Sequence, residues 1–116
     1  MNSFSPDLHD RKILGARHHP QQETLDIFLD GGTLHLTATV SFLLETLTEQ
    51  NIILDVYTCP SRQVPQNWLN EHPWLEDFTD DAYRFVLIIP SAGCIGIIVQ
   101  RTDGCIEYSA EYSEPK

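Results

Sequence analysis

The most constraining feature of the sequence is a pair of alternating segments on either side of Asp30-Gly31-Gly32. From Thr24 to Leu29, and again from Thr33 to Val40, every second residue is apolar, which is the period of a strand with one buried face. Glycine supplies the positive φ angles that a tight turn between antiparallel strands requires. The pattern predicts a β-hairpin whose inward face carries Leu25, Ile27, Leu29, Leu34, Leu36, Ala38 and Val40.

Four further segments have the length and composition of strands. Ile52 to Thr58 is rich in β-branched and aromatic residues and is stopped by Cys59-Pro60. The last third of the chain contains three such segments, separated by turn-forming residues that include proline and glycine. The middle one is apolar on both faces, which predicts a central strand that is covered on both sides. The three segments are Tyr83 to Ile89, Cys94 to Gln100 and Cys105 to Tyr112.

Two short helices are expected between the strands. Ser41 is a good N-cap, and the apolar residues after it recur at helical spacing, so a first helix is predicted from Ser41 to about Asn51. Pro65 suits the first turn of a second helix, which runs to about Glu71. Pro73 then ends or kinks this helix, because proline disfavours helical geometry in the residue before it.

In chain order these elements predict an α+β fold. The expected architecture is a single, mainly antiparallel sheet of about five to six strands (order β-β-α-β-α-β-β-β) with two short helices packed on one side. Residues 1–23 have no clear period and are expected to form a flexible N-terminal arm, so that residues 24–116 are a single α+β domain. Truncation before Gln21 is accordingly expected to leave the melting temperature almost unchanged.

The charge of the chain is unusual because basic residues are scarce. The chain has seventeen acidic and seven basic residues, which give a formal net charge of −10. Between residues 18 and 115 there are 15 acids and only three bases, Arg62, Arg84 and Arg101. Such a surface repels nucleic acid and anionic membranes and speeds encounter with basic proteins. We therefore expect a basic protein partner, no direct nucleic-acid binding and no membrane binding, although solubility alone also accounts for the acidity.

No motif for catalysis, cofactor binding or metal binding is found. The chain lacks a phosphate-binding loop, a dinucleotide-binding glycine pattern and a serine nucleophile elbow. Its five histidines have no metal-binding spacing. Cys94 precedes an apolar run, which favours a buried strand position over a reactive nucleophile. We therefore expect no enzymatic activity, no cofactor and no metal site.

Cysteine usage and the N-terminus predict the compartment. Cys59, Cys94 and Cys105 are odd in number and lack Cys-x-x-Cys spacing, which indicates reduced thiols. The first residues lack the basic and apolar regions of a secretory signal, and no apolar run approaches the ~20 residues that span a bilayer. These features favour a cytoplasmic protein.

One constellation indicates a binding surface: aromatic residues interleaved with acids between residues 68 and 83. Aromatic anchors ringed by carboxylates suit the recognition of a basic protein surface. The alternative is that Trp68 and Phe78 belong to the core and that the acids form a solvated loop. The candidate partner-binding residues are Trp68, Glu71, Trp74, Glu76, Asp77, Asp80 and Asp81.

Small size, acidity and the absence of a catalytic motif together favour a protein-binding domain. The leading hypothesis is an inhibitor or immunity-type protein that neutralises a basic partner such as a nuclease toxin. The alternatives are an acidic adaptor or secretion-chaperone-like module, for which a homodimer is possible, and a small-molecule-binding domain without catalysis. The sequence does not specify the oligomeric state.

Overall fold

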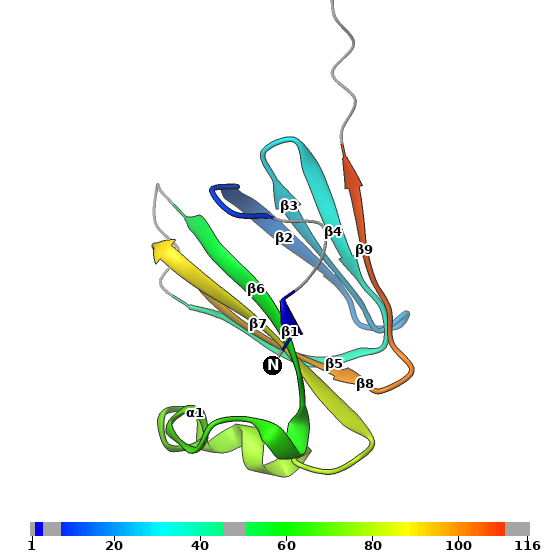
Figure 1. Ribbon diagram of the computed structural model, residues 1–116. Helices are drawn as coiled ribbons and strands as arrows, with labels where there is room; N and C mark the ends of the chain where they lie inside the picture. The colour runs from blue at the N-terminus through cyan, green and yellow to red at the C-terminus, as the bar shows by residue number, and fades with distance from the viewer. Residues whose placement is uncertain (1, 4–7, 46–50, 111–116) are drawn as a thin grey trace, which may run out of the picture.

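Among the residues that the structure describes, strands make up 58% and helical turns 15%, so the fold is mostly β rather than α+β. The computed structural model describes residues 2–3, 8–45 and 51–110. The strands form two antiparallel sheets stacked face to face, with the helical turns gathered at one end (Figure 1). The expected single sheet of five to six strands was wrong, because each sheet buries its apolar face against the other.

The two sheets, A and B, divide the strands unequally. Sheet A has the order β1-β6-β7-β8-β5, and sheet B has the order β2-β3-β4-β9. Sheet A comprises β1 (Asn2–Ser3), β6 (Ile52–Pro60), β7 (Tyr83–Ala92), β8 (Ile95–Arg101) and β5 (Thr39–Glu45). Sheet B comprises β2 (Ile13–His19), β3 (Thr24–Leu29), β4 (Gly32–Leu36) and β9 (Ile106–Ala110). Between β6 and β7 lie the helical turns η1 (Ser61–Gln63), α1 (Gln66–Glu71) and η2 (Pro73–Phe78).

Two chain segments pass between the sheets at the same corner of the sandwich. β4 leads into β5 through Thr37 and Ala38, and β8 leads into β9 through residues 102–105 (Figure 1). Ala38 has a φ of 50°, a left-handed conformation that helps redirect the strand into the second sheet. The crossing segments are hydrogen-bonded to each other, from Thr37 N to Cys105 O over 3.0 Å and from Arg101 N to Ala38 O over 2.9 Å.

The helix expected from Ser41 to Asn51 is wrong over its first half, because residues 39–45 form strand β5. Phe42 and Leu44 pack in the core between the sheets, whereas Leu43 packs on the opposite face of sheet A. β5 is an edge strand with an apolar core on each face, and the stabilisation from this packing outweighs the weak helical preference of the sequence. Residues 46–50 of the expected helix lie outside the described residues.

The flexible arm expected over residues 1–23 is also corrected, because most of its second half is ordered. Residues 13–19 form β2, which pairs with β3 at the edge of sheet B. Leu8 and Ile13 are only 3% and 4% exposed and belong to the main core. Residues 10–13 also bond to β6 and to the residue before it, with Asp10 N donating to Ile53 O over 2.9 Å and Ile13 N donating to Asn51 O over 2.7 Å, so this segment joins the two sheets. The strand has no visible period because Ile13 is its only buried residue.

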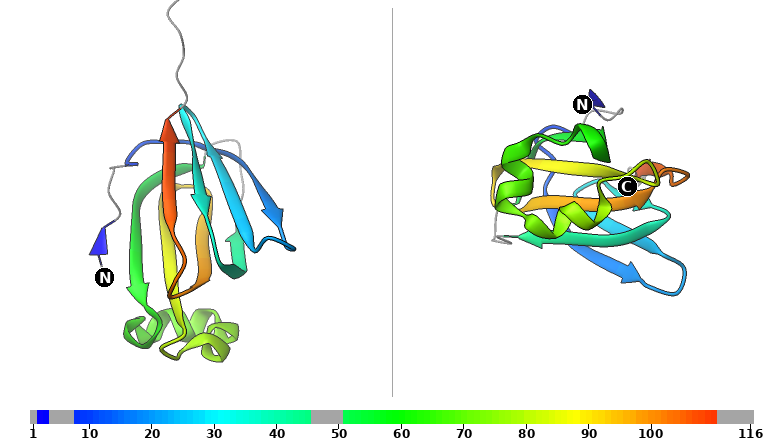
Figure 2. Two further views of the ribbon diagram at one scale, coloured as in Figure 1. Left: turned by 90° about the vertical axis from the view of Figure 1, so that its right-hand side faces the viewer. Right: turned by 90° about the horizontal axis from the view of Figure 1, so that it is seen from below.

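Two apolar cores lie on the two faces of sheet A. Along β7, Val86 and Ile88 face sheet B, and Phe85 and Leu87 face the other side, where the helical turns cover one end of the sheet (Figure 2). The buried residues of the first core are Leu8, Ile13, Leu25, Ile27, Leu29, Leu34, Leu36, Ile53, Val56, Val86, Ile88, Cys94 and Ile98. Those of the second are Cys59, Val64, Leu75, Phe85, Leu87, Ile97 and Val99.

Several local expectations are confirmed. The hairpin of β3 and β4 turns at Gly31, whose φ is 86°, and its five leucine and isoleucine residues from Leu25 to Leu36 are buried. Its second strand ends at Leu36 rather than at Val40, because the chain crosses to sheet A after Leu36, and Val40 lies in β5 and packs on the second core. Strands β6, β7 and β8 overlap the segments expected from the sequence. Helix α1 begins directly after Pro65. Among the described residues, no helix is both long and apolar enough to cross a membrane.

The three cysteines form no disulfide and differ in exposure. Cys59 and Cys94 are buried, and burial raises the pKa of both thiols, whereas Cys105 is exposed. Because the thiolate is the reactive form, iodoacetamide is expected to modify Cys105 alone in the folded protein, with Cys59 and Cys94 slower by on the order of 100-fold. Peptide mapping by mass spectrometry measures this selectivity, and labelling in urea, where all three should react, is the control. Equal labelling of Cys59 and Cys105 in the native state would contradict the burial.

Candidate functional site

The acidic aromatic segment from the sequence forms a cap at one end of the sandwich. It consists of α1, η2 and the loop up to β7, which lie together at one end of sheet A (Figures 1 and 2). Trp68 and Trp74 are half-buried and pack on the second core. Trp74 also contacts Phe78 edge-to-face, with ring centroids 6.2 Å apart. Much of each tryptophan therefore holds the cap onto the sheet, which favours the core interpretation of these rings.

The five acids of the segment fall into two groups. Glu71, Glu76 and Asp77 are exposed, and no basic side chain of the described residues pairs with them. Asp80 accepts a hydrogen bond from Ala82 N over 2.7 Å at its Oδ1 atom. Asp81 pairs with Arg62 over 2.8 Å. The first group leaves its charge to solvent, whereas the second is bound into the local structure.

A cleft of about 310 Å³ opens beside the cap and brings together residues from three stretches of the chain. Of the seven candidate residues, only Asp80 and Asp81 line it, so the structure does not gather the whole set into one site. Its lining residues are Thr58, Cys59, Pro60, Ser61, Arg62, Asp80, Asp81, Tyr83, Arg84 and Thr102. The cleft thus combines two guanidinium groups with two carboxylates.

Arg84 is the lining residue that the sequence interpretation missed. Its Nε donates to Gln100 Oε1 over 3.0 Å, and its Nη2 donates to the carbonyl of Gly104 over 2.9 Å. Both acceptors are neutral, and no carboxylate of the described residues forms an ion pair with this half-buried guanidinium. The sequence feature that could have identified Arg84 is a basic residue at the start of an apolar strand in a chain with few bases.

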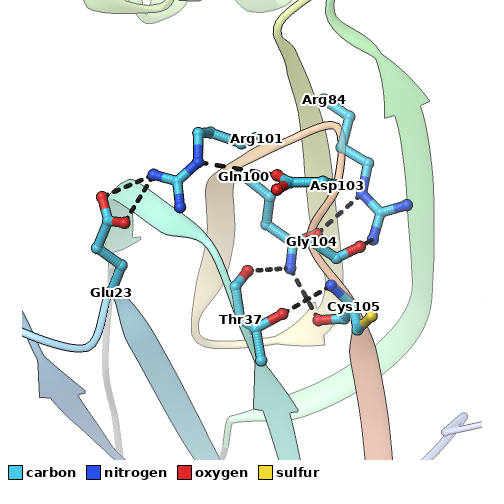
Figure 3. A network of polar contacts seen from close by, with 8 residues as sticks. All are labelled: Glu23, Thr37, Arg84, Gln100, Arg101, Asp103, Gly104 and Cys105. Carbon is cyan, nitrogen blue, oxygen red and sulfur yellow. Dashed lines mark hydrogen bonds and ion pairs between the residues drawn. The ribbon is translucent and has the colours of Figure 1, made fainter.

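A polar network at the crossing corner holds Arg84 in place (Figure 3). Gln100 is fully buried, and its amide nitrogen donates to Thr37 O over 2.8 Å and to Cys105 O over 3.0 Å. Arg101 pairs with Glu23 through both carboxylate oxygens, at 2.7 and 2.8 Å, and these hydrogen bonds raise the pKa of Arg101. The network provides hydrogen-bond partners for backbone carbonyl and N–H groups where the chain leaves one sheet for the other, so its primary role is structural.

A second polar cluster lies on the outer face of sheet B. Asp26 stands opposite His35 in the strand register, bonds to the ring nitrogen Nδ1 of His35, and lies 3.7 Å from Nε2 of His19. Within the described ranges, no group of three or more His, Cys, Asp or Glu side chains is placed to hold a metal ion. The cluster is a cross-strand hydrogen-bonded pair on a solvated sheet face, with a second histidine beside it.

The chemistry of the cleft is that of binding by charge and hydrogen bonds. Cys59 lines it, but burial raises the pKa of the thiol and disfavours the nucleophilic thiolate. Ser61 donates its hydroxyl hydrogen bond to the carbonyl of Asp80 rather than to a base. Comparison of the chain with protein-family models, with curated proteins and with solved structures gives no match.

Proposed function

We propose that the chain is a small acidic protein-binding domain that uses the cap at the end of the sandwich to bind a basic partner. The observation that carries the proposal is the group of three exposed acids, Glu71, Glu76 and Asp77, for which the described residues provide no cation. Acids without an internal partner keep their charge available to an incoming protein. Asp80 and Asp81 extend the same charge toward the cleft.

The half-buried tryptophans support this role by making the cap a fixed platform. Trp68 and Trp74 are packed on the second core, so the ring area they still expose stands in a defined position. A preorganised surface loses less conformational entropy on binding than a mobile loop does. The proposed class is an inhibitor or immunity-type protein that covers a basic active site, such as that of a nuclease. The three unbridged thiols support the cytoplasm as the compartment.

Reversal of the three unpaired acids tests the proposal. The variant Glu71→Lys, Glu76→Lys, Asp77→Lys should lose a basic partner in affinity capture, and should slow its association with that partner by about tenfold or more at low salt. Capture with quantitative mass spectrometry identifies the partner, and surface plasmon resonance at several salt concentrations then measures the association rate. The melting curve should stay unchanged, because none of the three side chains has a charged partner among the described residues.

A second triple variant controls for net charge. Asp10→Lys, Glu45→Lys, Glu107→Lys makes the same change in charge at exposed positions away from the cap. It should retain most of the association rate, because steering acts mainly through charges near the interface. If both triples slow association equally, the effect is one of total charge, and the cap is not the binding surface. If neither does, the acidity serves solubility.

A further inference from the structure

We infer that the cleft beside Arg84 binds a small zwitterion of the amino-acid class, at a site that borders the proposed protein-binding cap and shares only Asp80 and Asp81 with it. The starting observation is a half-buried cation without a counter-charge. Arg84 lines the cleft and is hydrogen-bonded only to the neutral oxygens of Gln100 and Gly104 among the described residues. A partly desolvated cation gains more from a carboxylate than a solvated one does, so the cleft favours a ligand that provides one.

The guanidinium of Arg84 is oriented to receive a carboxylate. Its Nε and Nη2 atoms are held by the network, which fixes the plane of the group. The third nitrogen has no drawn partner and points away from Gln100 and Gly104 (Figure 3). Two hydrogens on Nη1 and one on Nη2 therefore remain. One hydrogen from each of these nitrogens forms the end-on fork that binds both oxygens of a carboxylate.

The carboxylates that line the same cleft do not already neutralise Arg84. Asp80 accepts the backbone N–H of Ala82, and Asp81 is paired with Arg62. The Arg62–Asp81 pair is highly exposed, at 63% and 88% of the two side chains, so it is weak and exchanges readily with a ligand group. The cleft thus keeps a positive group and negative groups that can each meet an opposite charge.

The charges of the cleft and of the whole chain indicate a neutral, dipolar ligand. A ligand that carries only a carboxylate is an anion, and it would be repelled by the negative field of a chain whose formal charge is −10. A ligand that also bears an ammonium group has no net charge, and Asp80 and Asp81 can receive that group while Arg84 receives the carboxylate. A volume of about 310 Å³ is at the lower end for ligand pockets and suits a single amino acid.

Titration of the labelled protein with amino acids tests the inference. The twenty common amino acids, each at about 10 mM, are added to the ¹⁵N-labelled full chain, and the amide resonances of Ala82, Thr102 and Gly104 report on the cleft. At least one amino acid should bind with a Kd of about 1 mM or lower. Acetate and ethylammonium, which each carry one half of the recognised group, should bind at least about tenfold more weakly.

Cleft variants separate this site from a nonspecific effect. Thr102→Glu places a carboxylate in the cleft for Arg84 without removing the bonds of the arginine, and it should weaken binding by about tenfold. Arg84→Lys keeps the charge but loses the fork, and it should weaken binding similarly. Asp81→Asn should weaken amino-acid binding and leave acetate binding unchanged. Glu76→Gln, which removes an acid that does not line the cleft, should change neither.

Several outcomes would overturn the inference. One is the absence of any shift at 10 mM; another is binding that survives Thr102→Glu in a protein with a normal melting curve. Acetate that binds as tightly as the best amino acid would remove the zwitterion assignment. The triple variant of Glu71, Glu76 and Asp77 should keep amino-acid binding, so failure of the proposed partner surface and failure of this site are distinguishable.

Discussion

Removal of residues 1–20 is expected to abolish cooperative folding of the chain. The deletion takes away β2 and two core residues, Leu8 and Ile13, and it leaves β3 as an unpaired edge. It also breaks the bonds between residues 10–13 and β6, including Ile53 N to Arg11 O at 2.9 Å. Burial of each of the two side chains contributes about 1.5–3 kcal/mol, and the total with the strand approaches the 5–15 kcal/mol that stabilises a typical domain. Urea unfolding followed by circular dichroism measures the loss.

Adjacent point variants give the matched control for this prediction. Ile13 is 4% exposed and Leu14 is 67% exposed, although the two residues differ little in size or hydrophobicity. Ile13→Ala is expected to lower the free energy of unfolding by about 3 kcal/mol, whereas Leu14→Ala should change it by less than about 0.5 kcal/mol. An unchanged urea midpoint for the truncated chain, or equal effects of the two alanine variants, would contradict this prediction. Either result would support the flexible N-terminal arm that the sequence pattern favours.

Replacement of Gln100 by leucine should destabilise the protein by about 3 kcal/mol or more. Gln100 is fully buried and satisfies three groups at the crossing corner, namely the carbonyls of Thr37 and Cys105 and the Nε of Arg84. Leucine has a similar volume but no polar atoms, so all three groups lose a partner. The Cys105 carbonyl keeps its hydrogen bond from Thr37 N, whereas the Thr37 carbonyl and the Nε of Arg84 are left unsatisfied. Each buried group that is left unsatisfied costs about 1–3 kcal/mol. Chemical denaturation of the variant and the wild type measures the difference.

Two companion variants show whether this loss comes from the hydrogen bonds. Gln100→Glu keeps an acceptor for Arg84 but loses both donors to the carbonyls, so it should also be destabilising. Thr37→Val removes the hydroxyl that accepts the Cys105 N–H over 2.8 Å, and a loss of about 1–2 kcal/mol is expected. If Gln100→Leu costs less than about 1 kcal/mol, the network does not stabilise the corner.

The sequence by itself determined the elements whose pattern is complete within a few residues. The hairpin of β3 and β4 was predictable because strict alternation and a glycine turn need no distant partner to be recognised. Strand β8 was predictable for the same reason, since apolar side chains on both faces require a covered position. Pro65 marked the start of α1, although the structure places it at the N-cap, with an extended ψ of 143°, rather than inside the first turn. For the candidate site, the sequence located the acidic segment but not its contacts.

The tertiary structure decided which face of each element is covered, and by what. β5 has a spacing that fits a weak helix, yet pairing with β8 and apolar cores on both sides make it a strand. β2 has a single buried residue, so only its pairing with β3 and its bonds to β6 reveal that it belongs to the fold. The cleft exists because β6, the cap and the β8–β9 crossing meet around Arg84. Contacts between residues far apart in the chain leave no periodic signal, so the site they form is visible only in three dimensions.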